Sequence, residues 1–111
     1  MPRQSVFDMK LSQVYPLLIA KAERKGRTKA EVDAVTEWLT GYDMSSVDLD
    51  VTCAEFFGDA PGWNPRAELI TGTVCGVRVE TIEDPLMKRI RQLDKLVDEL
   101  AKGKPLEKIL R

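Results

Sequence analysis

Apolar residues recur at helical spacing along the last third of the chain, and this stripe constrains the fold more than any other feature. Intervals of four, three, four and three residues separate its members, which are Leu86, Ile90, Leu93, Val97 and Leu100. This spacing places them on one face of an α-helix, and that face must be buried against other elements. Asp84 and Pro85 favour the start of this helix, and Gly103 favours its end.

Two capping boxes mark further helix starts. A Thr followed three positions later by a Glu can satisfy two backbone amides at a helix N-terminus, and the pattern occurs at Thr28–Glu31 and at Thr52–Glu55. The first box predicts a helix that ends at Gly41, because glycine readily adopts the left-handed conformation of helix ends. The second box predicts a short helix over residues 53–59.

Weaker patterns fill the two ends of the chain. Residues 5–12 alternate between apolar and polar and are compatible with a short extended N-terminal arm. The first helix is expected to begin between Ser12 and Pro16 and to end at Gly26. A last short helix is expected to begin at Pro105.

Residues 66–80 fit two structures, because their apolar positions match a helical face and also the alternation of a strand. Gly72 and Gly76 weaken a helix, yet no second strand is evident to pair with this one, so we favour a helix. The length of 111 residues indicates one domain. The expected architecture is all-α, a small orthogonal bundle of about five helices in a single domain over residues 1–111.

Composition limits the chemistry that the chain can perform. Histidine is absent, which removes the commonest general base and the usual metal ligand. Cys53 and Cys75 form no disulfide framework, and no apolar run is long enough to cross a membrane. We therefore expect a cytoplasmic protein without a cofactor or bound metal, and we favour a non-enzymatic function.

Charge is unevenly distributed along the chain. Residues 1–42 carry seven Lys or Arg and five Asp or Glu, residues 43–84 carry two and nine, and residues 85–111 carry eight and four. An acidic middle between basic ends favours packing of the ends around the middle, or head-to-tail association of copies.

Five motifs in order resemble one known family. They are RKGRT, WLTGY, CGVRVE, IEDPLM and LDKLVDELAKG, and the likeness covers nearly the whole chain. By these motifs the chain resembles the bacterial domain-of-unknown-function 2200 family. The resemblance implies a small, mainly helical cytoplasmic protein, and it brings no activity, cofactor or catalytic residue.

The segment Lys21–Lys29, here called the basic turn, has two interpretations. Arg24, Lys25, Arg27 and Lys29 would hold phosphates if the two flanking helices formed a helix-turn-helix. However, the first turns of the second helix carry carboxylates, which would face a nucleic acid backbone. A solvated turn between two helices is the alternative that we favour, because acidic residues also stabilise a helix N-terminus.

The apolar stripe is also a candidate for contact between copies. Core packing within one chain is the role that we favour for the stripe, and a homodimer contact through Leu93, Val97 and Leu100 is the alternative. Cys53 and Cys75 are expected to be packing residues rather than reactive thiols, because no histidine is present to lower a thiol pKa. The acidic segment 43–50 is expected to be a solvated loop rather than a calcium site.

These observations lead to two hypotheses about function. The first is a non-enzymatic protein–protein interaction module that self-associates. The alternative is a nucleic-acid-binding accessory protein that uses the basic turn, whose binding would weaken steeply with salt.

Overall fold

The longest helix carries the predicted apolar stripe. The computed structural model describes residues 9–74 and 76–110, and in it this helix, α4, spans Pro85–Ala101 with Asp84 as its N-cap. The Asp84 carboxylate accepts hydrogen bonds from the backbone amides of Leu86 (2.9 Å) and Met87 (3.1 Å). The predicted start of this helix is therefore confirmed.

Helices dominate the remaining elements, and one small sheet interrupts them. The other helices are α1 (Leu11–Glu23), α2 (Lys29–Thr40), α3 (Cys53–Gly58), η1 (Pro65–Leu69), η2 (Val79–Thr81) and α5 (Leu106–Ile109), and the strands are β1 (Thr73–Val74) and β2 (Val77–Arg78). The chain is thus mostly helical, as predicted, but it is not purely all-α. None of the helices described is long and apolar enough to cross a membrane.

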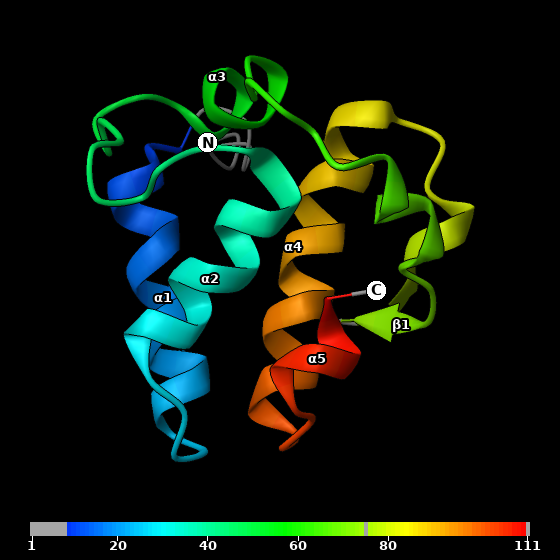
Figure 1. Ribbon diagram of the computed structural model, residues 1–111. Helices are drawn as coiled ribbons and strands as arrows, with labels where there is room; N and C mark the ends of the chain where they lie inside the picture. Colours follow the sequence, from blue (N-terminus) through cyan, green and yellow to red (C-terminus); the bar gives the residue numbers. More distant parts are fainter. Residues whose placement is uncertain (1–8, 75, 111) are drawn as a thin grey trace, which may run out of the picture.

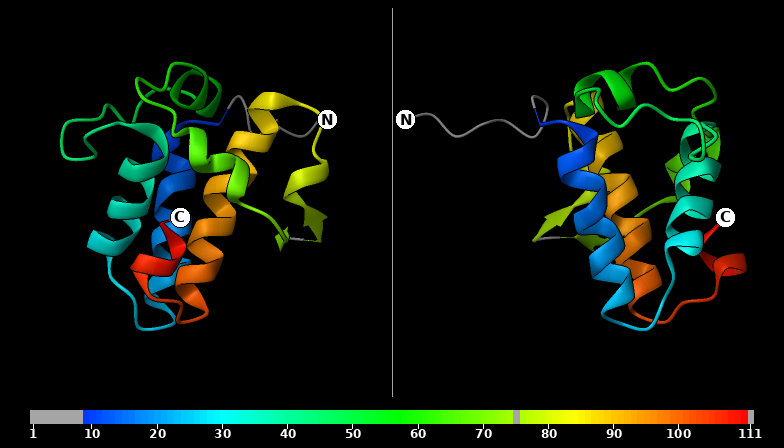
Figure 2. Two further views of the ribbon diagram at one scale, coloured as in Figure 1. Left: turned by 45° about the vertical axis from the view of Figure 1, so that its right-hand side comes forward. Right: turned by 90° about the vertical axis from the view of Figure 1, so that its left-hand side faces the viewer.

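Helices α1, α2 and α4 lie side by side and form the body of the molecule (Figures 1 and 2). α1 and α4 run in the same direction and α2 runs in the opposite one, so α1 and α2 form a hairpin. The Tyr15 hydroxyl of α1 donates to the Asp33 carboxylate of α2 (2.6 Å), which ties the hairpin together. The sequence led us to expect an orthogonal bundle. In the structure the long helices run alongside each other instead.

The core lies between α4 and the elements that surround it. α4 packs against α1, α2, α3, α5, β1 and η2. The buried side chains of α4 are Ile90, Gln92, Leu93, Leu96, Val97, Glu99 and Leu100. Because neighbours cover it from several sides, the stripe that the sequence revealed is the centre of the hydrophobic core.

The predicted helix over residues 66–80 is wrong. The 3-10 helix η1 begins the segment, β1 and β2 then pair as an antiparallel hairpin in which Val74 lies opposite Val77, and the 3-10 helix η2 follows from Val79. Gly72 (φ 109°) and Gly76 (φ 79°) adopt positive φ values, which an α-helix cannot accommodate. The strand that pairs with β1, which the sequence did not reveal, lies within the same segment.

The first helix begins earlier than predicted. α1 starts at Leu11, because the amides of Leu11 and Ser12 donate to the carbonyls of Val51 and Leu49, each at 2.8 Å. These contacts satisfy amides of the first helical turn, and sequence spacing gives no sign of them. Of the predicted extended arm, residues 5–8 lie outside the described residues, and Lys10 forms an isolated antiparallel bridge with Thr52.

Both capping boxes form as predicted. Thr28 and Glu31 cap α2, and Thr52 and Glu55 cap α3. Gly41 ends α2 in the left-handed conformation, with φ 80°.

Candidate functional site

Most of the basic turn takes part in contacts within the chain. The Arg27 guanidinium donates to the carbonyls of Leu100 (3.3 Å) and Lys104 (3.0 Å), which belong to the end of α4 and the turn after it. It also pairs with Glu31, and this hydrogen bond is the main reason that the pKa of Glu31 lies below its usual value. Arg27 therefore fastens the α1–α2 turn to the C-terminal end of α4.

Two of the turn's lysines are paired with carboxylates. Lys21 lies 3.2 Å from Asp94 and 3.5 Å from Asp98, both on α4. Lys29 lies 2.8 Å from Asp33. The flanking helices also run antiparallel, whereas the helices of a helix-turn-helix cross steeply (Figure 1).

Arg24 and Lys25 remain at the exposed tip of the turn. The Arg24 side chain reaches the Ala20 carbonyl at 3.4 Å, and Lys25 has no ion pair with any residue in the described part of the chain. The basic residues singled out in the sequence thus fall into two groups. Arg27 and Lys29 are paired within the chain, and Arg24 and Lys25 project into solvent.

We expect Arg27→Met to lower the free energy of unfolding by about 2 kcal/mol. Hydrogen bonds to charged groups contribute roughly 1.5–3 kcal/mol, and the partial exposure of this side chain places the loss towards the lower part of that range. Lys25→Met removes the same charge at the exposed tip and should change stability by less than about 0.5 kcal/mol. Urea unfolding of both variants measures the difference, and equal losses would show that Arg27 does not fasten α4.

The residues proposed for a homodimer contact are buried within one chain. Leu93, Val97 and Leu100 have exposed fractions of 1%, 0% and 0%. A second copy could reach them only if the core opened, so contact between folded copies needs other residues.

The remaining candidates from the sequence are the two cysteines and the acidic segment. Cys53 is buried in the core, and burial raises the pKa of its thiol, so it is a packing residue as predicted. Cys75 lies outside the described residues. Among residues 9–74 and 76–110, no group of three or more Cys, Asp or Glu side chains is placed to hold a metal ion.

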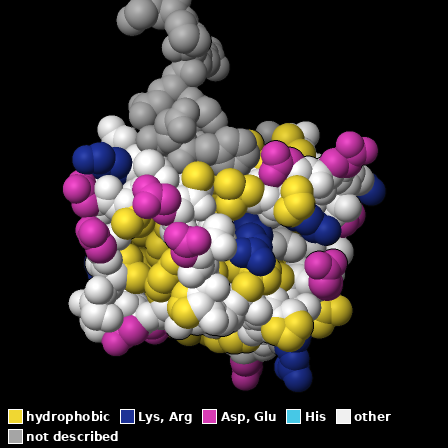
Figure 3. Space-filling model, turned by 90° about the horizontal axis from the view of Figure 1, so that it is seen from above, with side chains coloured by type: hydrophobic (Ala, Val, Ile, Leu, Met, Phe, Trp, Pro, Cys, Tyr) yellow, Lys and Arg dark blue, Asp and Glu magenta, His cyan; other side chains and the backbone are white. Residues whose placement is uncertain are grey.

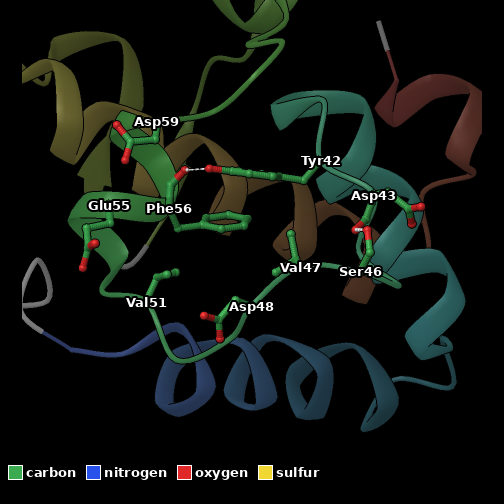
Figure 4. Close-up of a pocket in the computed structure, with 9 residues that line it drawn as sticks. All are labelled: Tyr42, Asp43, Ser46, Val47, Asp48, Val51, Glu55, Phe56 and Asp59. Carbon is green, nitrogen blue, oxygen red and sulfur yellow. Dashed lines mark hydrogen bonds between the residues drawn. The ribbon is translucent and has the colours of Figure 1, made fainter.

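A pocket that the sequence did not predict lies between α3 and the loop that follows α2. Its volume is about 310 Å³, and its lining residues are Tyr42, Asp43, Ser46, Val47, Asp48, Val51, Glu55, Phe56 and Asp59. We call it the acidic pocket. Figure 4 shows the side chains of the loop facing those of α3 across it.

An aromatic pair holds the two sides of the acidic pocket together. The rings of Tyr42 and Phe56 are stacked, with their centroids 4.5 Å apart and an angle of 18° between their planes. The Tyr42 hydroxyl donates to the Phe56 carbonyl at 2.8 Å (Figure 4). Burial, followed by the nearby Asp59 carboxylate, raises the pKa of Tyr42, so this hydroxyl stays protonated at neutral pH.

Close packing of backbone fixes the position of Tyr42. The amide of Gly62 donates to the Thr40 carbonyl (3.1 Å), and the Asn64 amide donates to the Leu39 carbonyl (2.9 Å). A Cβ atom at Gly41 would lie only 2.7 Å from the Gly62 backbone. Glycine at position 41 therefore permits the approach that directs Tyr42 towards α3.

The rim of the pocket carries negative charge. Asp43, Asp48, Glu55 and Asp59 line it, and among the described residues no Lys or Arg does. Hydrogen bonds from the hydroxyl and amide of Ser45 lower the pKa of Asp43, which keeps that carboxylate ionised well into the acid range. Seen from above, in Figure 3, Asp and Glu side chains border an area of exposed hydrophobic surface.

Local structure accounts for the placement of three of these carboxylates. Asp43 accepts from the Ser45 amide (3.0 Å), Asp48 accepts from the Asp50 amide (2.9 Å), and Glu55 belongs to the capping box of α3. The sequence did predict an acidic loop here, but it did not show that Tyr42 and Phe56 would lie beneath it. The sequence pattern that could have indicated the pocket is a capping box next to an acidic loop and aromatic residues.

Comparisons with known proteins place the chain in a family. The model of DUF2200, described as an uncharacterized protein conserved in bacteria, matches residues 5–111. A solved structure titled "Crystal structure of uncharacterized protein SP1917" has 50% sequence identity and a TM-score of 0.89, over 98% of this chain and 93% of that one. No curated protein matches the chain. The match to the family model covers nearly the whole sequence, and the chain therefore belongs to the DUF2200 family of uncharacterised bacterial proteins.

Proposed function

We propose that this protein is a non-enzymatic cytoplasmic interaction module whose acidic pocket binds a basic segment of a partner protein. One observation carries the proposal, namely a concave surface with an apolar floor and a rim of carboxylates with which no lysine or arginine of residues 9–74 and 76–110 forms an ion pair. Lysine and arginine side chains combine an apolar stem with a charged end, so they match such a surface. Apolar residues beside them in the partner would add contact with the pocket floor.

The chemistry of the pocket supports binding rather than catalysis. The Ser46 hydroxyl donates to the Asp43 backbone carbonyl (3.2 Å), and the Tyr42 hydroxyl donates to the Phe56 carbonyl. Within the described part of the chain, neither hydroxyl is hydrogen-bonded to a side chain that could serve as its general base, which an activated nucleophile requires. Because the chain contains no histidine, the commonest such base is absent.

The pocket also argues against nucleic acid as the main partner. Its carboxylates would repel phosphates, and Lys21, Arg27 and Lys29 of the basic turn are already paired within the chain. A polyanion would therefore meet few free cations. A protein segment with lysines or arginines meets no such obstacle.

Neutralising two pocket carboxylates should weaken binding of a basic peptide about tenfold. Exposed ion pairs contribute roughly 0.2–1 kcal/mol each, and two of them approach the 1.4 kcal/mol that corresponds to tenfold affinity. The variant combines Asp48→Asn with Asp59→Asn, and its matched control combines Glu68→Gln with Glu107→Gln, which removes the same charge outside the pocket. Fluorescence anisotropy with a labelled peptide of alternating lysine and leucine measures the affinity.

Three results would contradict the proposal. The first is equal binding of the peptide to both variants, and the second is no binding to the unaltered protein. The third is binding of the peptide no tighter than that of spermidine, because this would show that the pocket binds small cations. Preferential binding of an oligonucleotide over the peptide would favour the nucleic-acid hypothesis instead.

A further inference from the structure

The acidic pocket and the exposed tip of the basic turn lie at opposite ends of one helical hairpin. The pocket adjoins the C-terminal end of α2, and the turn precedes the N-terminal end of the same helix. In Figure 1 the C-terminal end of α2 lies at the top of the α1–α2 hairpin, and the turn lies at the bottom. Each chain therefore carries a negative concave surface at one end and a positive projection at the other.

The two charged surfaces are too far apart to neutralise each other within one chain. α2 has 12 residues, and a rise of about 1.5 Å per residue separates its ends by about 18 Å. Interactions between exposed charges are screened beyond about 8 Å at physiological ionic strength. Neither surface is thus neutralised by the other in an isolated chain.

The basic end offers side chains that suit the pocket. Arg24 and Lys25 are exposed, and together with Lys21 and Lys102 they line a groove where the ends of α1 and α4 meet. Asp98 is the carboxylate in that lining, and it is already bonded to Lys102 at 3.1 Å. Arg24 and Lys25 carry the exposed positive charge of the tip, and the exposed Glu23 beside them offsets part of it.

We propose that the basic turn of one copy binds in the acidic pocket of another, with Arg24 and Lys25 facing the Asp48 and Asp59 carboxylates. The inference rests on the proposed function, and it identifies the partner as a second copy of this chain. Complementary charge and the match of a projecting turn to a concave pocket support it. The contact leaves Leu93, Val97 and Leu100 in the core, unlike the homodimer contact considered from the sequence.

This contact joins two different surfaces, so each added copy leaves one free pocket and one free turn. Such head-to-tail association continues beyond a dimer unless the rotation between copies closes a ring. The average mass in solution should therefore rise steadily with protein concentration. It should fall towards that of the monomer when salt is raised, because the contact is largely electrostatic.

Two variants that block opposite ends provide the decisive experiment. One combines Asp48→Lys with Asp59→Lys and blocks the pocket, and the other combines Arg24→Gln with Lys25→Gln and blocks the turn without creating a charge that the lysine-substituted pocket would attract. All four positions are exposed, so the fold should persist, and circular dichroism checks this. Sedimentation velocity should show that each variant alone is monomeric. An equimolar mixture should form a dimer and nothing larger, because it retains one intact pocket and one intact turn.

Several results would overturn the proposal. The unaltered protein could stay monomeric at every protein and salt concentration tested. The pocket-blocked variant could still associate by itself, or the mixture of the two variants could remain monomeric. A basic peptide that binds the unaltered protein, combined with absent self-association, would refute the second copy as partner and leave the proposed function standing. If the protein neither binds the basic peptide nor self-associates, the proposed function is refuted as well.

Discussion

Gly41→Ala should lower the free energy of unfolding by about 3 kcal/mol, because two separate costs combine at this position. The left-handed conformation costs a residue with a Cβ about 1–2 kcal/mol. Position 41 has φ 80°, and the new Cβ would lie 2.7 Å from both the Cα and the N atom of Gly62. Backbone atoms cannot turn aside as a flexible side chain does, and overpacking of this kind costs about 1–3 kcal/mol more.

Gly26→Ala is the matched control for that prediction. Gly26 has almost the same φ, 82°, but a Cβ there would meet nothing within 4 Å. It should therefore cost only the conformational part, about 1–2 kcal/mol. Urea unfolding of both variants, compared at equal m-values, isolates the cost of the Gly41–Gly62 approach. Equal losses in the two variants would show that the close approach contributes nothing.

Phe56→Ala should destabilise the protein by about 3–5 kcal/mol, the usual cost of removing a buried phenylalanine side chain. Only 1% of Phe56 is exposed, and its ring stacks on Tyr42 and meets the edge of Phe57 at 5.1 Å between centroids. The substitution also removes the floor of the acidic pocket. Binding of the basic peptide should consequently weaken under conditions in which the variant remains folded.

Leu17→Ala provides the comparison for Phe56. Leu17 is 63% exposed on α1, so its truncation should change stability by less than about 0.5 kcal/mol. Urea unfolding measures both variants. If Phe56→Ala were as mild as Leu17→Ala, the packing of α3 against the loop after α2 would be incorrect, and with it the pocket.

Features that depend on neighbours a few residues apart were predictable from the sequence. Each capping box needs a Thr and a Glu three positions apart, so the starts of α2 and α3 could be read directly. The stripe of α4 was visible for the same reason, since helical spacing shows which side chains share a face. It could not show which elements cover that face, and it left a contact between copies open until the structure showed Leu93 and Leu100 buried within one chain.

Contacts between distant parts of the chain were not predictable. Arg27 bonds to carbonyls 73 and 77 positions away, so its role in holding α4 had no local pattern. Tyr42 and Phe56 meet across the intervening loop, and the acidic pocket depends on that contact. The β1–β2 hairpin was missed because strands this short carry little periodicity, and the torsion angles of Gly72 and Gly76 decided the outcome.

Backbone amide NMR during titration with the lysine–leucine peptide tests the central claim most directly, because it locates binding residue by residue. We predict that ¹H–¹⁵N shifts will move at Tyr42, Val47, Val51, Phe56 and Asp59, and that they will return when salt is added. The same titration with a glutamate–leucine peptide should leave those signals in place. Shifts confined to other surfaces, or equal shifts with both peptides, would contradict a pocket built to receive a basic protein segment.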